Sequence, residues 1–145
     1  MSGQPAETRS IVVEREFAHP PEKLWRALTE PHLIAEWLMK NDFKPEPGHR
    51  FQFQIDPMPN WSGVIDSEVL VVEPNRTLSY AWNSGEGALA METVVTLSLT
   101  PTATGTLLRV EQTGFRPDQK QNIMGATYGW RNFFGKLDAL LPGMQ

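Results

Sequence analysis

The sequence predicts an α+β domain in which a long C-terminal helix packs across a curved antiparallel β-sheet, with two short helices after the first strand. Three observations predict this fold. Short stretches that alternate apolar and polar residues, bounded by Pro, Gly and Asn turns, fill residues 51–115. Two short amphipathic stretches precede them, and a helical apolar period begins near Gln121. Because strands and helices are grouped rather than alternating, the pattern does not favour βαβ units.

Length and composition limit the function classes. A chain of 145 residues has the length of one domain, so we expect residues 1–145 to form a single unit with residues 1–8 flexible. The net charge of −4 offers no basic surface to phosphate groups, and nucleic acid is not an expected partner. The lack of cysteine excludes disulfides and fits a reducing compartment. With neither a signal peptide nor a membrane span evident, we expect a cytoplasmic protein.

The first strand and the helix pair come first in the chain. Residues 11–17 (IVVEREF) alternate between two faces and are expected to form an edge strand. Two prolines after His19 end this strand. Proline suits the first turn of a helix, because the backbone N–H groups there make no hydrogen bond within the helix. Helical apolar spacing then runs through PPEKLWRALTE and again, after Pro31, through PHLIAEWLMK. Two short consecutive helices are therefore expected.

A run of strands follows the helix pair. Residues 51–55 alternate phenylalanine with glutamine, and residues 64–72 and 77–82 form a hairpin around the turn Glu73-Pro74-Asn75-Arg76. Residues 89–99 and 106–115 form the last two strands, with a turn between them. Because each connection is short, we expect an antiparallel meander.

Residues 64–72 allow two registers. One turns Asp66 and Glu68 toward the core, and the other turns Ile65, Val69 and Val71 inward and leaves both carboxylates in water. Since carboxylates are rarely buried without partners, we favour the second register.

The closing helix begins at about Gln121 and is ended by Pro142-Gly143. A straight helix of roughly 20 residues diverges from a curved sheet on one side, and a ligand-sized space can open there. The apolar stripe of this helix comprises Ile123, Thr127, Trp130, Phe134, Leu137 and Leu141.

Large inward side chains are the candidate lining of such a space. The alternative is that they fill an ordinary core, which is the commoner fate of aromatic residues on the inward face of a strand. Met58 and Trp61 lie on a proline-bearing loop and are candidates to cap an opening. The candidate ligand-binding residues are Trp37, Phe53, Met58, Trp61, Tyr80, Trp82, Met91, Gln112, Thr127, Trp130 and Phe134.

Segments from both ends and the middle of the chain resemble one known family. VEREFAHPPEKLWRALTEPHLIAEWL, SEVLVVEPNRTLSYAW, QTGF and GWRNFFGKLDALL occur in this order and at these spacings. Together they resemble the START-like (SRPBCC, helix-grip) superfamily, and more closely its subgroup related to the activator of Hsp90 ATPase. The resemblance implies a helix-grip domain with a hydrophobic cavity, which the superfamily uses for lipids, hormones, polyketides and other apolar ligands.

The leading functional hypothesis is therefore binding of a small hydrophobic or aromatic molecule without a cofactor, and we favour binding over catalysis. One alternative is an acid/base enzyme of the polyketide cyclase type, for which the polar candidates are Asp66, Glu68, Tyr80, Gln112 and Tyr128. Another is a module that regulates a chaperone of the Hsp90 type, which would need an exposed apolar patch. Strand edges and apolar loops also allow a homodimer.

Motifs for other chemistry are not evident. His19, His32 and His49 lack the i,i+4 spacing of a helical metal pair, and we assign no metal site. No nucleophile elbow, glycine-rich phosphate loop or zinc signature occurs, so we assign no catalytic residue.

Overall fold

A computed structural model of the chain describes residues 8–56, 62–85 and 90–144. The predicted loop residues Met58 and Trp61 lie outside the described residues, as does most of the segment that we expected to be flexible. In the described part, no helix is both long and apolar enough to cross a membrane.

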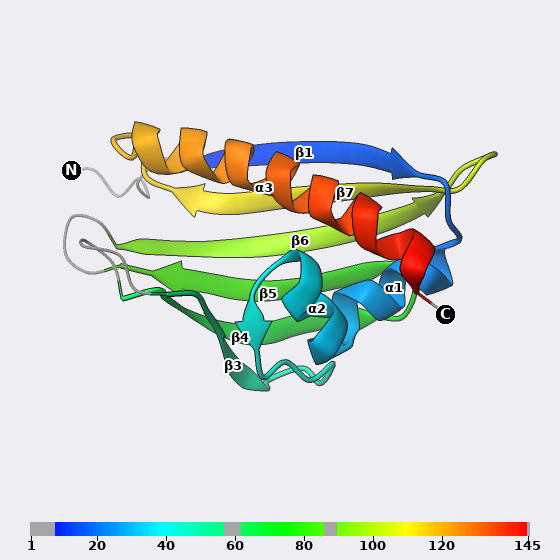
Figure 1. Ribbon diagram of the computed structural model, residues 1–145. Coiled ribbons are helices and arrows are strands. Elements are labelled where there is room, and N and C mark those ends of the chain that lie inside the picture. Colours follow the sequence, from blue (N-terminus) through cyan, green and yellow to red (C-terminus); the bar gives the residue numbers. More distant parts are fainter. Residues whose placement is uncertain (1–7, 57–61, 86–89, 145) are drawn as a thin grey trace.

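The described strands form one antiparallel sheet of seven strands in the order β1-β7-β6-β5-β4-β3-β2 (Figure 1). The predicted meander and the edge position of the first strand are confirmed. A two-residue strand was not predicted, because two residues are too few to show an alternation. The strands are β1 (Arg9–Phe17), β2 (Lys40–Asn41), β3 (Arg50–Gln54), β4 (Val64–Glu73), β5 (Thr77–Ser84), β6 (Met91–Pro101) and β7 (Thr106–Phe115).

Strand β4 adopts the register in which its carboxylates face water. Ile65 and Val69 are buried, whereas Asp66 is exposed. The expectation that Val71 also faces inward is wrong, since 38% of this residue is exposed. Val69 pairs with Tyr80 and Val71 with Ser79, so Leu70 is an extra residue on β4. This β-bulge reverses the alternation beyond it.

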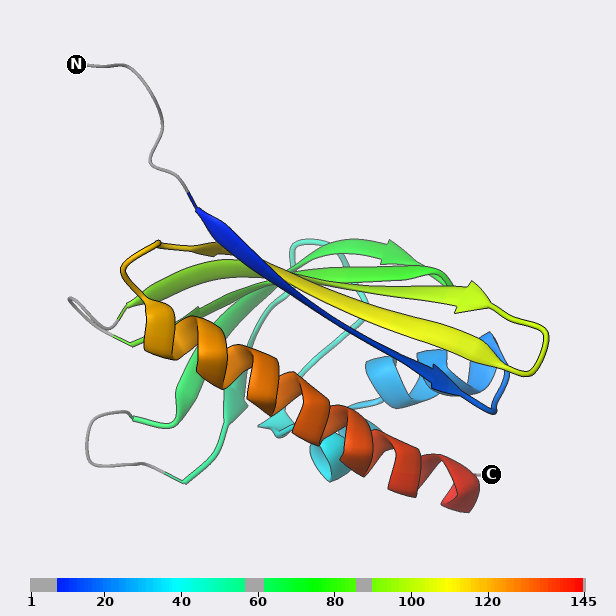
Figure 2. The ribbon, with the colours of Figure 1, turned by 90° about the horizontal axis from the view of Figure 1, so that it is seen from above.

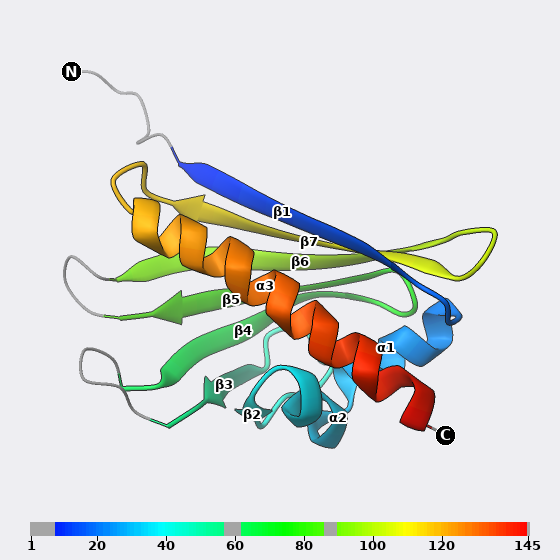
Figure 3. The ribbon, with the colours of Figure 1, turned by 45° about the horizontal axis from the view of Figure 1, so that its top comes forward.

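Three α-helices lie on one face of the sheet in the described residues: α1 (Pro21–Thr29), α2 (Pro31–Trp37) and α3 (Lys120–Leu140), the last followed by a 3₁₀ turn, η2 (Leu141–Gly143). Figures 2 and 3 show α3 crossing the strands on the side toward which the sheet curves. Its C-terminal half lies beside α2, and α3 also contacts β1 and β7. The 3₁₀ turn that follows α3 contacts α1. The predicted helix pair and closing helix are confirmed.

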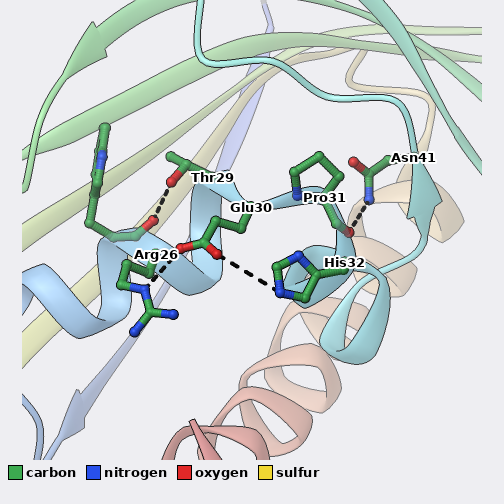
Figure 4. Close-up of polar contacts among 7 residues, drawn as sticks. Arg26, Thr29, Glu30, Pro31, His32 and Asn41 are labelled. Atoms are coloured by element: carbon green, nitrogen blue, oxygen red, sulfur yellow. Dashed lines mark hydrogen bonds and ion pairs between the residues drawn. The ribbon is translucent and has the colours of Figure 1, made fainter. Parts of the chain in front are cut away.

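The junction of α1 and α2 is held by polar contacts (Figure 4). The Glu30 carboxylate accepts a hydrogen bond of 2.9 Å from Arg26 Nε. Asn41 Nδ2 donates to the carbonyl of Pro31 at 3.1 Å and to the carbonyl of Met39 at 3.0 Å. These two bonds tie the start of α2 to the chain that leaves it, and so fix the backbone around Met39.

Aromatic side chains fill the core between the sheet and the helix pair. The ring of Tyr80 lies 5.6 Å from that of Phe51, 5.7 Å from that of Phe53 and 6.5 Å from that of Trp82. Tyr80 is 2% exposed, and this burial raises the pKa of its hydroxyl, because a phenolate would be poorly solvated there.

We expect this burial to limit stability at alkaline pH. The folded protein keeps the Tyr80 proton that the unfolded chain releases above about pH 10, so the unfolding free energy is unaffected below that pH and falls as the pH rises above it. Denaturant unfolding of the native protein and Tyr80→Phe over this range measures the difference. The Tyr80→Phe variant should lack this decrease of the unfolding free energy with rising pH. Tyr128→Phe should retain it, because the Tyr128 side chain is 75% exposed. Parallel losses in the native protein and Tyr80→Phe would contradict the prediction.

Candidate ligand-binding cavity

A cavity of about 430 Å³ lies between the N-terminal half of α3 and the sheet. This part of α3 covers the end where β5 and β7 finish and β4 and β6 begin, opposite α1 (Figures 1 and 3). The lining residues are Met39, Ile55, Ile65, Trp82, Ser84, Gly85, Met91, Gln112, Gln121, Asn122, Gly125, Ala126, Gly129, Trp130 and Phe133.

The uneven packing of α3 accounts for the position of this cavity. Trp130, Phe134 and Leu137 are buried and hold the C-terminal half of the helix against the core. Ile123 and Ala126, in the N-terminal half, are only partly buried. The helix is therefore packed tightly along its second half and leaves space beneath its first half.

The lining residues differ in exposure, and this difference distinguishes the closed floor of the cavity from its opening. Ile65, Trp82 and Gln112 are buried and lie at the floor. Gly85 and Gln121 line the same cavity but are exposed, so the opening lies near the first turns of α3. A ligand entering there would reach the tryptophan and the amide last.

A chain of buried hydrogen bonds crosses the floor. The indole Nε1 of Trp130 donates to Gln112 Oε1 at 2.9 Å, and Gln112 Nε2 donates to Thr93 Oγ1 at 2.9 Å. The Thr93 hydroxyl in turn donates to the carbonyl of Trp82 at 2.6 Å. An indole N–H can only donate and a carbonyl can only accept, so both ends of the chain fix the direction of every bond. The orientation of the Gln112 amide follows from its neighbours.

Gln112 has further hydrogen-bonding capacity. Its side chain offers two N–H donors and an oxygen with two lone pairs. The contacts just described use one N–H and one lone pair. Gln112 is 1% exposed and lines the cavity, so its remaining donor and acceptor are shielded from bulk water.

The rest of the lining is apolar or neutral. Among the described lining residues, none carries a charge. The polar ones besides Gln112 are Ser84, Gln121 and Asn122, and they lie toward the partly or fully exposed side. The chemistry offered by this lining is apolar contact combined with neutral hydrogen bonds.

Trp82, Met91, Gln112 and Trp130, all candidates from the sequence, lie in this wall. They come from β5, β6, β7 and α3, and the ring centroids of the two tryptophans are 5.5 Å apart. The sequence predicted that Gln112 shares an inward strand face with Leu108 and Val110. In the structure all three residues are buried on β7.

The other described candidates do not line the cavity. Phe53 and Tyr80 are buried among the aromatic residues of the core, and Phe134 packs on Phe17 at 6.1 Å. Trp37 is buried with its indole N–H donated to the carbonyl of Ala27 at 2.8 Å. The hydroxyl of Thr127, a partly buried residue, donates to the carbonyl of Ile123 at 3.0 Å.

Sequence reasoning missed most of the α3 wall. Gly125, Ala126 and Gly129 line the cavity, together with Phe133. The signal in the sequence was the pair of glycines one helical turn apart, since glycine weakens a helix and needs a reason there.

The acid/base candidates are dispersed. Asp66 accepts a hydrogen bond from Gln52 Nε2 at 2.8 Å on the outer face of the sheet, and Glu68 lies 3.6 Å from Arg50. Tyr128 is 75% exposed on α3. Within the described residues, no group of three or more His, Asp or Glu side chains is placed to hold a metal ion.

Residues 18–142 match the family model described as Activator of Hsp90 ATPase homolog 1-like protein. The crystal structure of protein MLL2253 from Mesorhizobium loti is similar, with 60% sequence identity and a TM-score of 0.87 over 94% of this chain and 99% of that chain. No curated protein matches the sequence significantly.

Two further crystal structures are more distant. CalU16 from Micromonospora echinospora is 25% identical, with a TM-score of 0.75 over 92% of this chain and 76% of that one. DynU16, a protein of the dynemicin biosynthetic locus, is also 25% identical, with a TM-score of 0.77 over 92% of this chain. The present chain spans 47% of the length of DynU16.

Proposed function

Since the chain belongs to the START-like family of proteins similar to the activator of Hsp90 ATPase homologue 1, we propose that it binds a small hydrophobic or aromatic molecule in the cavity beneath α3. The observation that carries this proposal is the buried floor of the cavity. There the ring of Trp82 provides apolar surface, and the amide of Gln112 is oriented by hydrogen bonds on both sides.

Size and chemistry both support binding. Small-molecule pockets commonly measure about 300–1,000 Å³ and are mostly apolar, with a few fixed polar groups. The cavity of about 430 Å³ falls in this range and combines such walls with one buried amide. Because that amide is held in place before a ligand arrives, little conformational entropy is lost in orienting it.

Binding can be tested without knowing the natural ligand. We would purify the protein under native conditions, search for bound molecules by native mass spectrometry, and record thermal melts with fatty acids, aromatic polyketides and flavonoid-like compounds. A ligand at 100 times its Kd stabilises the folded state by about 2.7 kcal/mol, which raises the melting temperature by several degrees. A co-purified molecule or a selective shift is the expected result.

A cavity-filling variant gives the specific control. Ala126→Leu places a larger side chain in the cavity wall and should abolish the ligand-induced shift while the protein remains folded. Ala139→Leu, at an exposed position of the same helix, should leave the shift unchanged. If no library compound shifts the melt and no molecule co-purifies, the proposal fails.

The same experiment separates binding from catalysis. DynU16 comes from a biosynthetic locus, and a cyclase-like reaction of a bound molecule is the enzymatic alternative. The described lining provides hydroxyl and amide groups, of which neither is a typical general acid or base at neutral pH. We therefore expect a bound compound to be recovered unchanged after incubation. Recovery of a converted product would instead establish an enzyme.

A further inference from the structure

Two glycines of α3 face the proposed binding cavity, although the fold itself gives no reason for them. A Cβ atom at Gly125 would have no described atom within 4 Å, and one at Gly129 would meet only the ring edge of Phe133, at 3.9 Å. Neither glycine has a positive φ. Alanine is more favourable than glycine within a helix, so both positions weaken α3 without relieving a clash or a strained backbone.

The consequence is a bare stretch of helix backbone along one wall. Gly125 and Gly129 are one turn apart and Ala126 lies between them, so no side chain longer than a methyl group projects from these three positions. On the sheet side, the inward-facing ring of Trp82 lies at the floor of the same cavity. A smooth helix wall and an aromatic ring therefore border one space, which suits a flat molecule better than a branched or twisted one.

Charge and hydrogen bonding define the ligand further. Burying an ionised group without a partner is costly, and none of the described lining residues is charged. The buried Gln112 amide retains one N–H and one lone pair that none of the described contacts uses. An uncharged ligand with a carbonyl oxygen would accept a hydrogen bond from the remaining N–H, and a ligand hydroxyl could also donate to the remaining lone pair.

We propose that Gly125 and Gly129 determine ligand specificity: they admit a flat, uncharged aromatic ring system that lies against the α3 backbone and directs an oxygen to Gln112. This inference rests on the proposed binding function and goes further by naming the ligand class and the residues that select it.

Three simple compounds test the shape and the oxygen. 9-Fluorenone has two aromatic rings held in one plane and a carbonyl oxygen, benzophenone has the same groups with twisted rings, and fluorene lacks the oxygen. Titration followed by tryptophan fluorescence should give at least tenfold tighter binding of fluorenone than of either other compound. Binding of benzophenone equal to or tighter than that of fluorenone would overturn the proposal.

Three glycine variants test the residues. Gly125→Ala and Gly129→Ala should each weaken fluorenone binding at least fivefold, because a methyl group would occupy the space of the ring system. Gly135→Ala lies on the same helix outside the cavity lining, and it should change the affinity less than twofold. All three variants should raise the melting temperature of the free protein, by about 2–4 °C each.

The outcomes separate the two proposals. Unchanged fluorenone affinity in Gly125→Ala and Gly129→Ala, or a lower melting temperature in these two variants alone, would show that the glycines serve the fold and not the ligand. If neither these three compounds nor any member of the larger library binds, the binding function itself fails. If only twisted or charged compounds bind, the function stands and the inference about shape is overturned.

Discussion

Phe134→Ala is expected to lower the free energy of unfolding by roughly 3–5 kcal/mol, whereas Phe133→Ala, one residue earlier, is expected to lower it by less than about 2 kcal/mol. Phe134 is 1% exposed, and its ring lies 6.1 Å from that of Phe17 on β1 and 6.1 Å from that of Trp130. Truncation there leaves a void in the contact that holds α3 on the sheet. Phe133 is only partly buried and lines the cavity.

The two variants should also differ in binding. Phe133→Ala removes apolar surface from the cavity wall, so it should weaken a bound aromatic compound although the protein remains stable. Chemical denaturation gives the stability of both variants, and thermal shift with a library ligand gives the binding. Because a domain of this size has only about 5–15 kcal/mol of stability, Phe134→Leu provides a milder variant if the alanine protein does not fold. Equal losses of stability at the two positions would refute this division of roles.

This neighbouring pair also illustrates how far the sequence could predict the site. Helical periodicity placed Trp130, Phe134 and Leu137 on one buried stripe of α3, as the structure has them. Periodicity describes direction around the helix axis but not distance from the sheet. Phe133 lies off the stripe and in the second half of the helix, yet it lines the cavity. Helical side chains lean toward the helix N-terminus, which brings its ring toward the half that diverges from the strands.

The same limit applies to the strands. Phe53 and Trp82 both face inward as their alternation predicted, and their ring centroids are 5.2 Å apart, but of the two only Trp82 lines the described cavity. Whether an inward residue belongs to the core or to a cavity wall depends on its position along the strand relative to α3. Family resemblance indicated a cavity, but it could not assign individual residues to its wall.

Local irregularities were hidden for a different reason. The β-bulge at Leu70 occurs in a run of apolar residues that ends with Val71 and Val72, where either face would carry an apolar side chain. The alternation of apolar and polar residues therefore could not show that the inward face changes at Leu70. The register around Asp66 was predictable, because a carboxylate has a strong preference for water.

The hydrogen-bonded floor leads to the second large effect, which we expect from Gln112→Leu. Leucine removes the acceptor of the Trp130 indole N–H, which is then buried without a partner in a residue that is 2% exposed. An unsatisfied buried donor costs about 1–3 kcal/mol. The Thr93 hydroxyl still donates to the carbonyl of Trp82, so the loss should arise mainly at Trp130.

A double-mutant cycle isolates that contribution. Trp130→Phe removes the donor. The double variant Gln112→Leu with Trp130→Phe therefore has no indole N–H that is buried without an acceptor. Denaturant unfolding of the four proteins should therefore show that the two single losses together exceed the double loss by about 1–2 kcal/mol. As a control, Gln52→Leu on the outer face removes a hydrogen bond to Asp66 that is exposed to water, and should change stability by less than about 1 kcal/mol. Additive losses at Gln112 and Trp130 would mean that this hydrogen bond does not orient the amide, and the preorganised floor on which the binding proposal depends would lose its basis.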